Sequence, residues 1–178
     1  MRVITGRARG MTLKTLDGET TRPTTEKVKE AVFSAIQFEI EGRRVLDLFA
    51  GSGQLGIEAL SRGAESCVFA DNDKNAVKII KSNIEKTGFE SNSKIVNMDA
   101  FSFLRMNTRI FDLVFLDPPY SSGLMKKALD EVSVFVAEGG TVVCEHALTD
   151  ALPDETGSLK KYRDYRYGKT AVSIYRKD

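Results

Sequence analysis

The chain has 178 residues, of which 42% are hydrophobic, so it can bury one core but is too short for two ordinary domains joined by a linker. No apolar run approaches the roughly 20 residues that cross a bilayer, and the N-terminus lacks a signal-peptide core, which argues against a membrane protein. Cys67 and Cys144 lie in apolar runs without metal-ligand spacing, so we expect reduced thiols, no metal site and a cytoplasmic protein.

The net charge of +1 is distributed unevenly along the chain. Residues 1–29 carry seven Lys and Arg against three Asp and Glu, and residues 158–178 carry seven against two. The stretch between them has twelve basic and twenty acidic side chains. Two basic ends around an acidic body favour contact with a polyanion such as a nucleic acid. Ordinary solvated surface charge would give the same counts, so the charge alone leaves both readings open.

The first forty residues are predicted to form a small extension, made of a short β-hairpin and a helix. Residues 6–10 read Gly-Arg-Ala-Arg-Gly and place two guanidinium groups in a loop bounded by glycines. Residues 24–39 predict an amphipathic helix, because apolar side chains recur at i, i+3, i+4, i+7 and i+8 from Val28. Thr24 or Thr25 can cap this helix, directly after Pro23.

From residue 45 onward, short strand-like runs alternate with helical patterns. Strands are expected at residues 45–49, 66–71, 93–97, 111–116 and 141–145, and helices at residues 74–87 and 125–135. Runs that are apolar on both faces indicate parallel strands covered by helices on both sides. Two further runs, residues 162–167 and 170–175, are joined around Gly168 and predict an antiparallel hairpin.

This pattern predicts an α/β fold with a mostly parallel seven-stranded sheet, helices on both faces and an antiparallel C-terminal hairpin. The architecture is similar to that of the class I Rossmann-like methyltransferases, which depend on S-adenosylmethionine. We therefore divide the chain into an N-terminal extension, residues 1–40, which we expect to contact RNA, and a methyltransferase domain, residues 41–178.

A glycine loop follows the first predicted strand. Gly51 and Gly53 permit a tight turn and let the backbone approach a ligand, at the start of a helix whose N–H groups are unpaired. Residues 51–56 also match the dinucleotide spacing G-x-G-x-x-G, so the glycines alone do not distinguish NAD from S-adenosylmethionine. The residues of this segment that we expect to bind the cofactor are Asp47, Phe49, Ala50, Gly51 and Gly53.

Acidic residues end the next two predicted strands. Asp71 follows the loop by twenty residues, where a carboxylate can accept hydrogen bonds from both ribose hydroxyls. Asp99 can accept from an adenine amino group while Ala100 or Phe101 packs on the ring. Either carboxylate could instead cap a helix, but together they favour an adenosyl group along one edge of the sheet. The cofactor residues predicted here are Asp71, Asn72, Asp99, Ala100 and Phe101.

The sequence Asp117-Pro118-Pro119-Tyr120 follows the fourth predicted strand and forms the predicted catalytic site. Consecutive prolines remove two backbone donors, so the carbonyls and the Asp117 carboxylate can face outward as acceptors. Two acceptors for the hydrogens of an aromatic amine favour a more nucleophilic nitrogen as positive charge develops on it. Tyr120 can stack on the base, worth roughly 1–3 kcal/mol. We expect direct displacement without a covalent nucleophile, and we interpret His146, the only histidine, as structural.

These motifs closely resemble those of the bacterial small-subunit ribosomal RNA guanine-N2 methyltransferases of the RsmD type. The resemblance covers nearly the whole chain and is carried by residues 1–10, 22–25, 28–33, 46–63 and 117–120. It implies transfer of a methyl group from S-adenosyl-L-methionine to the exocyclic N2 of one guanine in 16S rRNA, the guanine 966 type. It also implies a substrate within a partly assembled 30S subunit, and we expect the enzyme to act as a monomer.

The resemblance also implies roles for single residues. Asp47, Gly51 and Gly53 would bind the amino-acid portion of the cofactor, Asp71 its ribose and Asp99 its adenine, while Asp117 and Tyr120 would hold the guanine. Many relatives have Glu where Asp71 stands, which leaves open whether Asp71 or Asp73 makes the ribose contact. The residues expected to contact RNA are Arg7, Arg9, Arg22, Thr24 and Lys27.

Three other functions remain open to test. An adenine-N6 methyltransferase acting on DNA or another RNA needs the same corner at residues 117–120, because its target is also an aromatic amine. A non-catalytic RNA-binding module could keep the fold, although the intact Asp117 and Tyr120 argue against it. An NAD-dependent oxidoreductase is disfavoured, because no Tyr-Lys or His-Asp pair for hydride chemistry is evident.

Overall fold

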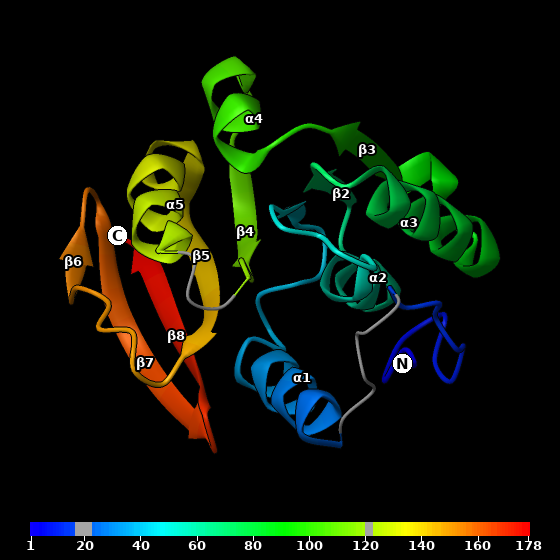
Figure 1. Cartoon of the computed structure of the whole chain (residues 1–178), viewed down its shortest axis with the longest axis horizontal. Coiled ribbons are helices and arrows are strands. Elements are labelled where there is room, and N and C mark those ends of the chain that lie inside the picture. The colour runs from blue at the N-terminus through cyan, green and yellow to red at the C-terminus, as the bar shows by residue number, and fades with distance from the viewer. Residues whose placement is uncertain (17–22, 120–122) are drawn as a thin grey trace.

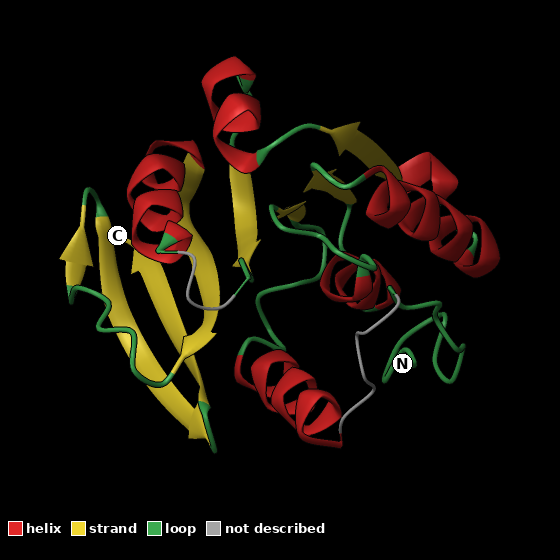
Figure 2. Cartoon of the chain, in the orientation of Figure 1, coloured by secondary structure: helices red, strands yellow, loops and turns green. Residues whose placement is uncertain are grey.

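An eight-stranded sheet forms the centre of the molecule (Figures 1 and 2). The computed structural model describes residues 1–16, 23–119 and 123–178. The strands are β1 (Arg44–Asp47), β2 (Ser66–Asp71), β3 (Ser93–Asn97), β4 (Phe111–Leu116), β5 (Val136–Ala147), β6 (Glu155–Thr156), β7 (Leu159–Tyr167) and β8 (Thr170–Lys177). Their order across the sheet is β3-β2-β1-β4-β5-β8-β7-β6, in which β1 to β5 are parallel and the last three strands are antiparallel to their neighbours.

Helices cover both faces of this sheet, as the apolar character of its strands predicts. They are α1 (Pro23–Ala35), α2 (Gln54–Ser61), α3 (Lys74–Thr87), α4 (Ala100–Met106) and α5 (Leu124–Val132), with the short 3-10 helices η1 (Glu90–Asn92) and η2 (Ser133–Phe135). The first three α-helices share one hydrophobic cluster with the sheet, and α4 and α5 share a second cluster on the other face. Within β4, Phe115 belongs to the first cluster and Val114 to the second. The predicted α/β architecture, a mostly parallel sheet with helices on both faces and antiparallel C-terminal strands, is confirmed.

The strand order reverses beside β1, and this reversal positions the functional site. From β1 the chain runs outward through β2 to β3, and it then returns to place β4 on the other side of β1. Asp47, the last residue of β1, is in register with Phe69 of β2 and Phe115 of β4. In open α/β sheets, ligands bind in the crevice outside the carboxyl ends of the strands at such a reversal.

Several boundaries differ from the sequence prediction for local reasons. The helix expected over residues 24–39 ends at Ala35, after which a turn buries Ile40 and leaves Phe38 exposed. The helix expected over residues 125–135 ends as η2 from Ser133 onward. Both ends follow tertiary packing, which helix periodicity does not encode.

The sheet has one strand more than the seven predicted, and one of its strands is longer than predicted. Residues 155–156 form an eighth strand, β6, because the chain reverses at Gly157, which has φ 55, and pairs back onto β7. The predicted strand at residues 141–145 is the central part of β5, which runs from Val136 to Ala147. Gly139, with φ 70, interrupts the alternating pattern of a strand, so residues 136–140 of β5 were not predicted from the sequence.

The N-terminal segment packs on the helices rather than standing apart. One antiparallel bridge joins Arg2 to Thr12, at the position of the expected hairpin. Val3, Ala8 and Leu13 are buried in the same cluster as the first three helices. The division between residues 1–40 and 41–178 stays a prediction.

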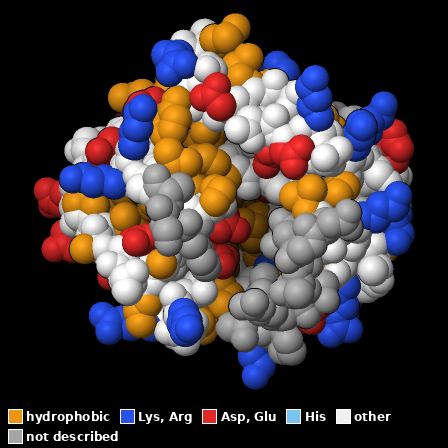
Figure 3. Space-filling model, in the orientation of Figure 1, with side chains coloured by type: hydrophobic (Ala, Val, Ile, Leu, Met, Phe, Trp, Pro, Cys, Tyr) orange, Lys and Arg blue, Asp and Glu red, His pale blue; other side chains and the backbone are white. Residues whose placement is uncertain are grey.

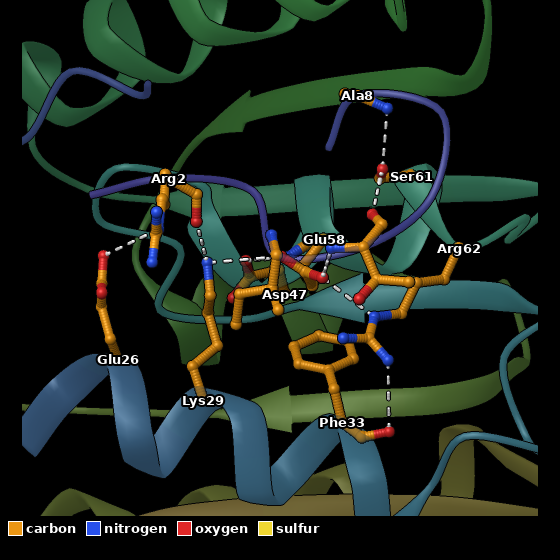
Figure 4. A network of polar contacts seen from close by, with 12 residues as sticks. Arg2, Ala8, Glu26, Lys29, Phe33, Asp47, Glu58, Ser61 and Arg62 are labelled. Atoms are coloured by element: carbon orange, nitrogen blue, oxygen red, sulfur yellow. Dashed lines mark hydrogen bonds and ion pairs between the residues drawn. The ribbon is translucent and has the colours of Figure 1, made fainter. Parts of the chain in front are cut away.

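A buried carboxylate, Glu58 of α2, joins this segment to the body of the protein (Figure 4). Its oxygens accept hydrogen bonds from the backbone N–H groups of Ile4 and Thr5, at 2.8 and 3.0 Å. Arg62 Nε lies 2.9 Å from Glu58 Oε1, and Lys29 Nζ of α1 lies 3.4 Å from Oε2. Burial lowers the pKa of Lys29, and the charge of Glu58 opposes that shift. Glu58 therefore ties the N-terminal segment, α1 and α2 together.

Within the described ranges, no helix is both long and apolar enough to cross a membrane.

Candidate active site

A cavity of about 880 Å³ opens at the carboxyl ends of the parallel strands. In the space-filling view, hydrophobic and acidic side chains meet in a hollow near the middle of this face (Figure 3). The predicted site residues that line the cavity are Asp47, Phe49, Ala50, Gly51, Asp71, Asn72, Asp99, Ala100, Phe101, Asp117, Pro118 and Pro119. Gly53 is not in the lining, and Tyr120 lies outside the described residues. The fold thus brings together residues from four separate strand ends.

Three glycines shape the loop after β1, and each is required for a different reason. Gly51 and Gly53 have φ 53 and φ 77, a left-handed backbone that favours glycine. Gly53 is the N-cap of α2 and turns the chain into that helix. At Gly56 an added Cβ would lie 2.3 Å from Phe69 and 2.6 Å from Cys67 Sγ, so this glycine lets α2 pack directly on β2. The G-x-G-x-x-G spacing is therefore a structural requirement of this turn and not a sign of NAD alone.

Asp71 holds the glycine loop against the end of β2. Its Oδ2 accepts a hydrogen bond of 2.8 Å from the N–H of Gly51, and its Oδ1 accepts one of 2.9 Å from the N–H of Asp73. Asp73 instead caps α3, because its carboxylate accepts from the N–H of Asn75 at 2.8 Å. Both carboxylates line the cavity, but only Asp71 also orders the loop. The contact between Asp71 and the ribose stays a prediction.

We expect Asp71→Ala to weaken binding of S-adenosylmethionine by about 10- to 100-fold, since a lost hydrogen bond to a charged group is worth about 1.5–3 kcal/mol. Asp73→Ala should cost about 1 kcal/mol of stability through the lost cap and change affinity much less. Isothermal titration calorimetry on both variants measures the two effects. A greater loss of affinity for Asp73→Ala than for Asp71→Ala would reverse the assignment.

Asp47 is a buried acid at the base of the cavity. Its Oδ2 accepts a hydrogen bond of 3.0 Å from the N–H of Gly56, which fixes the start of α2 on β1. Burial raises the pKa of Asp47 to about 7, the Gly56 hydrogen bond opposes this shift, and the nearby charge of Asp71 adds to it. Near neutral pH this carboxyl is therefore poised between its neutral and charged forms.

The raised pKa of Asp47 predicts a pH-dependent stability. Between about pH 4 and pH 7 the folded chain keeps a proton that the unfolded chain releases, so this residue lowers the free energy of unfolding as pH rises, and the effect levels off above pH 7. Asp47→Asn removes the effect. The free energy of unfolding of Asp47→Asn, relative to that of the native chain, should therefore rise by up to about 1.4 kcal/mol per pH unit between about pH 4 and pH 7. Urea unfolding at several pH values measures this difference. A difference that does not change with pH would contradict the prediction.

Asp117, Pro118 and Pro119 follow β4 and form the wall of the cavity nearest to β5. In the parallel pairing of these strands, Leu116 of β4 is in register with Cys144 of β5. The next residues along the two strands are Asp117 and Glu145, and both line the cavity. Two carboxylates therefore lie on adjacent strands at this edge of the cavity, Asp117 just after β4 and Glu145 two residues before the end of β5.

Comparison with known proteins identifies the family. The family model described as conserved hypothetical protein 95, which represents the RsmD family, matches residues 1–176. The chain belongs to the RsmD family. The resemblance drawn from the sequence motifs is thereby confirmed.

Relatives of this RsmD-family chain match it over nearly its whole length. YlbH of Bacillus subtilis is 42% identical over 182 residues, covering 99% of each chain. The ribosomal RNA small subunit methyltransferase D of Escherichia coli K12 is 31% identical over 180 residues, covering 100% of this chain and 90% of that protein. Among solved structures, yhhF of Escherichia coli has a TM-score of 0.87 at 29% identity and covers 100% of this chain and 98% of its own.

Asp99 caps a helix and also lines the cavity, and its contact with adenine stays a prediction. It follows β3 by two residues and caps α4, because its Oδ1 accepts a hydrogen bond of 3.0 Å from the N–H of Ser102. Hydrogen bonds from Ser102 lower the pKa of Asp99. It also lines the cavity, where an ionised carboxylate has further acceptor positions for an adenine amine. Phe101 lies beside it, with Lys127 of α5 placed 4.1 Å from its ring centroid.

The predicted RNA-contacting residues lie on and near the N-terminal segment. Arg7, Arg9 and Lys27 are exposed, and the Arg7 guanidinium stacks 5.0 Å from the ring centroid of Phe89. Thr24 lies in the first turn of α1, and Arg22 lies outside the described residues. Met1 and Leu16 line the large cavity. This RsmD-family chain thus has basic side chains on the segment that forms part of the cavity wall.

Sequence reasoning missed several residues of the site. Glu145 and Gln54 line the cavity without having been assigned a role, and Gln54 Oε1 is buried without a hydrogen-bond partner in the described part of the chain. The rule that carboxyl ends of parallel strands meet at one edge would have found Glu145, since it ends the predicted strand at residues 141–145. Gln54 carries no comparable signal.

His146 has partners that sequence spacing did not reveal. It is buried, and its Nε2 lies 2.8 Å from Ser173 Oγ of β8. Ser173 in turn donates a hydrogen bond of 2.6 Å to Asp164 of β7. These contacts join β5, β8 and β7, which fits the structural interpretation. Among residues 1–16, 23–119 and 123–178, no group of three or more His, Cys, Asp or Glu could hold a metal ion.

Proposed function

We propose that this protein transfers a methyl group from S-adenosyl-L-methionine to the exocyclic N2 of a guanine in 16S rRNA, the guanine 966 type. The observation that carries the proposal is that a single cavity holds both the acidic strand ends suited to an adenosyl group and the Asp117-Pro118-Pro119 corner suited to an aromatic amine. The name of the Escherichia coli relative, ribosomal RNA small subunit methyltransferase D, supports the substrate class.

The residues present fit S-adenosylmethionine. Asp71 can accept from the ribose hydroxyls, and Asp99 from the adenine amine, with Ala100 beside it. Asp47 and Gly51 line the same cavity, where they suit the charged amino-acid portion. When bound, the cofactor supplies a methyl group on a positively charged sulfur, which is a strong electrophile.

The Asp117 corner acts on the amine. The Asp117 carboxylate and a backbone carbonyl of the proline turn accept the two hydrogens of the exocyclic amine and hold its lone pair toward the methyl carbon. With the cofactor bound, the amine nitrogen would form the new bond to the methyl carbon, and the electron pair of the broken carbon–sulfur bond would stay on sulfur. The nitrogen then loses one proton to Asp117 or to water. Positioning accounts for most of the acceleration, because no covalent step on the protein is required.

Methylation assays on defined substrates test the function. The purified protein is incubated with radiolabelled S-adenosylmethionine and with 30S particles or free 16S rRNA from a strain lacking the gene, and separately with DNA. We expect N2-methylguanine at a single position of 16S rRNA by mass spectrometry, with 30S particles as the better substrate. N6-methyladenine in DNA or RNA would support the alternative enzyme, and no transfer to any of these substrates would remove the proposal. Light scattering tests the expected monomer.

We propose that Arg9 of the N-terminal segment and Lys27 of α1 bind rRNA phosphates, in the cytoplasm where ribosomal subunits assemble. We expect Arg9→Ala and Lys27→Ala each to weaken RNA binding and to reduce the slope of log affinity against log salt by about 1. Cofactor affinity should stay unchanged. Lys94→Ala, on the exposed side of β3, is the charge-matched control. An equal loss for Lys94→Ala would show that only net charge matters.

A further inference from the structure

We propose that Glu145 makes the enzyme select guanine over adenine, by accepting a hydrogen bond from the ring N1–H of the target base. This inference rests on the proposed function and assigns its base selectivity. Asp117 cannot supply that selectivity, because the exocyclic amines of guanine and adenine both present hydrogens to an acceptor. A second group, in contact with the adjacent ring nitrogen, is required.

Glu145 stands where the two reactants would meet. A second cavity of about 290 Å³ adjoins the large one, between the start of α5, the end of β5 and residues 149–152. The residues that line both cavities are Pro118, Pro119 and Glu145. The smaller cavity has about a third of the volume of the larger, so it suits a single base rather than the adenosyl donor. A base in it would extend its amine past the shared residues toward Asp117, which lines only the larger cavity.

The chemistry of guanine matches the two neighbouring carboxylates. Guanine presents N1–H beside its N2 amine, so two adjacent positions on its edge are hydrogen-bond donors. Adenine presents an N1 lone pair beside its N6 amine, so its second position is an acceptor. Asp117 and Glu145 follow residues paired in register on β4 and β5, and strands in a sheet lie about 4.8 Å apart. This spacing lets Asp117 take the amine and Glu145 take N1–H.

A carboxylate at this place both attracts the right base and rejects the wrong one. Adenine would bring its N1 lone pair against the negative charge of Glu145, and neither group would have a proton to share. Lys126 lines the smaller cavity and can donate to guanine O6, which adenine lacks. A site built to pair with a particular hydrogen-bonding group discriminates far more strongly than an apolar pocket.

The test compares two targets in one enzyme. Particles are reconstituted with 16S rRNA that carries either the native guanine or adenine at the mapped target position, and kcat/KM is measured for each. For Glu145→Gln we expect the guanine-to-adenine ratio to fall by about 100-fold or more, because the glutamine amide can donate to adenine N1. Cofactor affinity by calorimetry should stay unchanged, which a general disruption of the fold would not allow.

Matched variants make the outcome decisive. Glu138 lies on the surface near the start of β5, far along the strand from Glu145. Glu138→Gln should therefore leave the guanine-to-adenine ratio of kcat/KM unchanged. Glu145→Asp keeps the charge on a shorter side chain, so it should lower the rate but retain the preference for guanine. This variant tests the proposal if Glu145→Gln does not fold. An unchanged ratio in Glu145→Gln, or a loss of preference in Glu145→Asp, overturns the role of Glu145 while the proposed function stands. If the native protein methylates no 16S rRNA guanine, both fall together.

Discussion

Asp117→Ala is expected to lower the rate constant of methyl transfer by about 10²- to 10³-fold, because it removes an acceptor directed at the charge that develops on the amine. The affinity for S-adenosylmethionine should change by no more than a few-fold, since Asp71, Asp99 and the glycine loop remain in place. Single-turnover kinetics on 30S particles measure the first quantity, and calorimetry measures the second.

A control on the same strand separates catalysis from folding. Asp112 lies at the opposite end of β4, where it accepts hydrogen bonds of 2.9 Å from Arg44 and does not line the cavity. Asp112→Ala should cost stability but leave the transfer rate constant within about twofold. If Asp117→Ala and Asp112→Ala lowered the rate equally, the effect would belong to β4 as a whole, and the catalytic role of Asp117 would be lost.

Glu58→Ala is expected to lower the free energy of unfolding by about 3–5 kcal/mol, the largest stability effect among the changes considered. The substitution leaves the buried Lys29 without its carboxylate partner and removes the acceptor of the Ile4 and Thr5 N–H groups. Urea unfolding at pH 7 measures the loss. Hydrogen exchange at residues 2–13 should accelerate as well, because Glu58 anchors that segment to α2.

A surface glutamate provides the comparison for Glu58. Glu85 lies in α3, half exposed, and pairs only loosely with Lys81 at 4.0 Å. Glu85→Ala should change the free energy of unfolding by less than about 0.5 kcal/mol. A loss of under 1 kcal/mol for Glu58→Ala would mean that the buried carboxylate network contributes little to stability, and that apolar packing alone holds the N-terminal segment.

The parts of the fold that the sequence predicted are those set by local pattern. Apolar runs such as 111–116 identified the buried parallel strands, and Gly168 identified the final hairpin. Gly51 and the acidic residues after the strands were expected to meet because a parallel sheet brings its carboxyl ends to one edge, and they do line one cavity. The topology therefore converted motifs that lie seventy residues apart into one cavity.

The parts that escaped prediction depend on contacts between distant residues. The sequence around Ala35 contains no signal for the end of α1. The turn that follows buries Ile40 in the core and lets the Glu39 carboxylate accept hydrogen bonds from Thr141 and Arg176. The partner of His146 lies 27 residues away on β8, and the second cavity beside Glu145 arises only when α5 packs beside β5. The helix α4 was not predicted, because its seven residues are too few to show the 3.6-residue periodicity of apolar side chains.

The N-terminal segment has a thermodynamic consequence, because Met1 and Leu16 contribute to the wall of the cofactor cavity. A polyanion bound to this segment, as proposed, would change the free energy of filling the cavity behind it. By reciprocity, occupancy of the cavity must alter affinity for the polyanion by the same factor. If the segment binds rRNA as proposed, the two ligands would be energetically linked through a stretch of main chain that Glu58 anchors to α2.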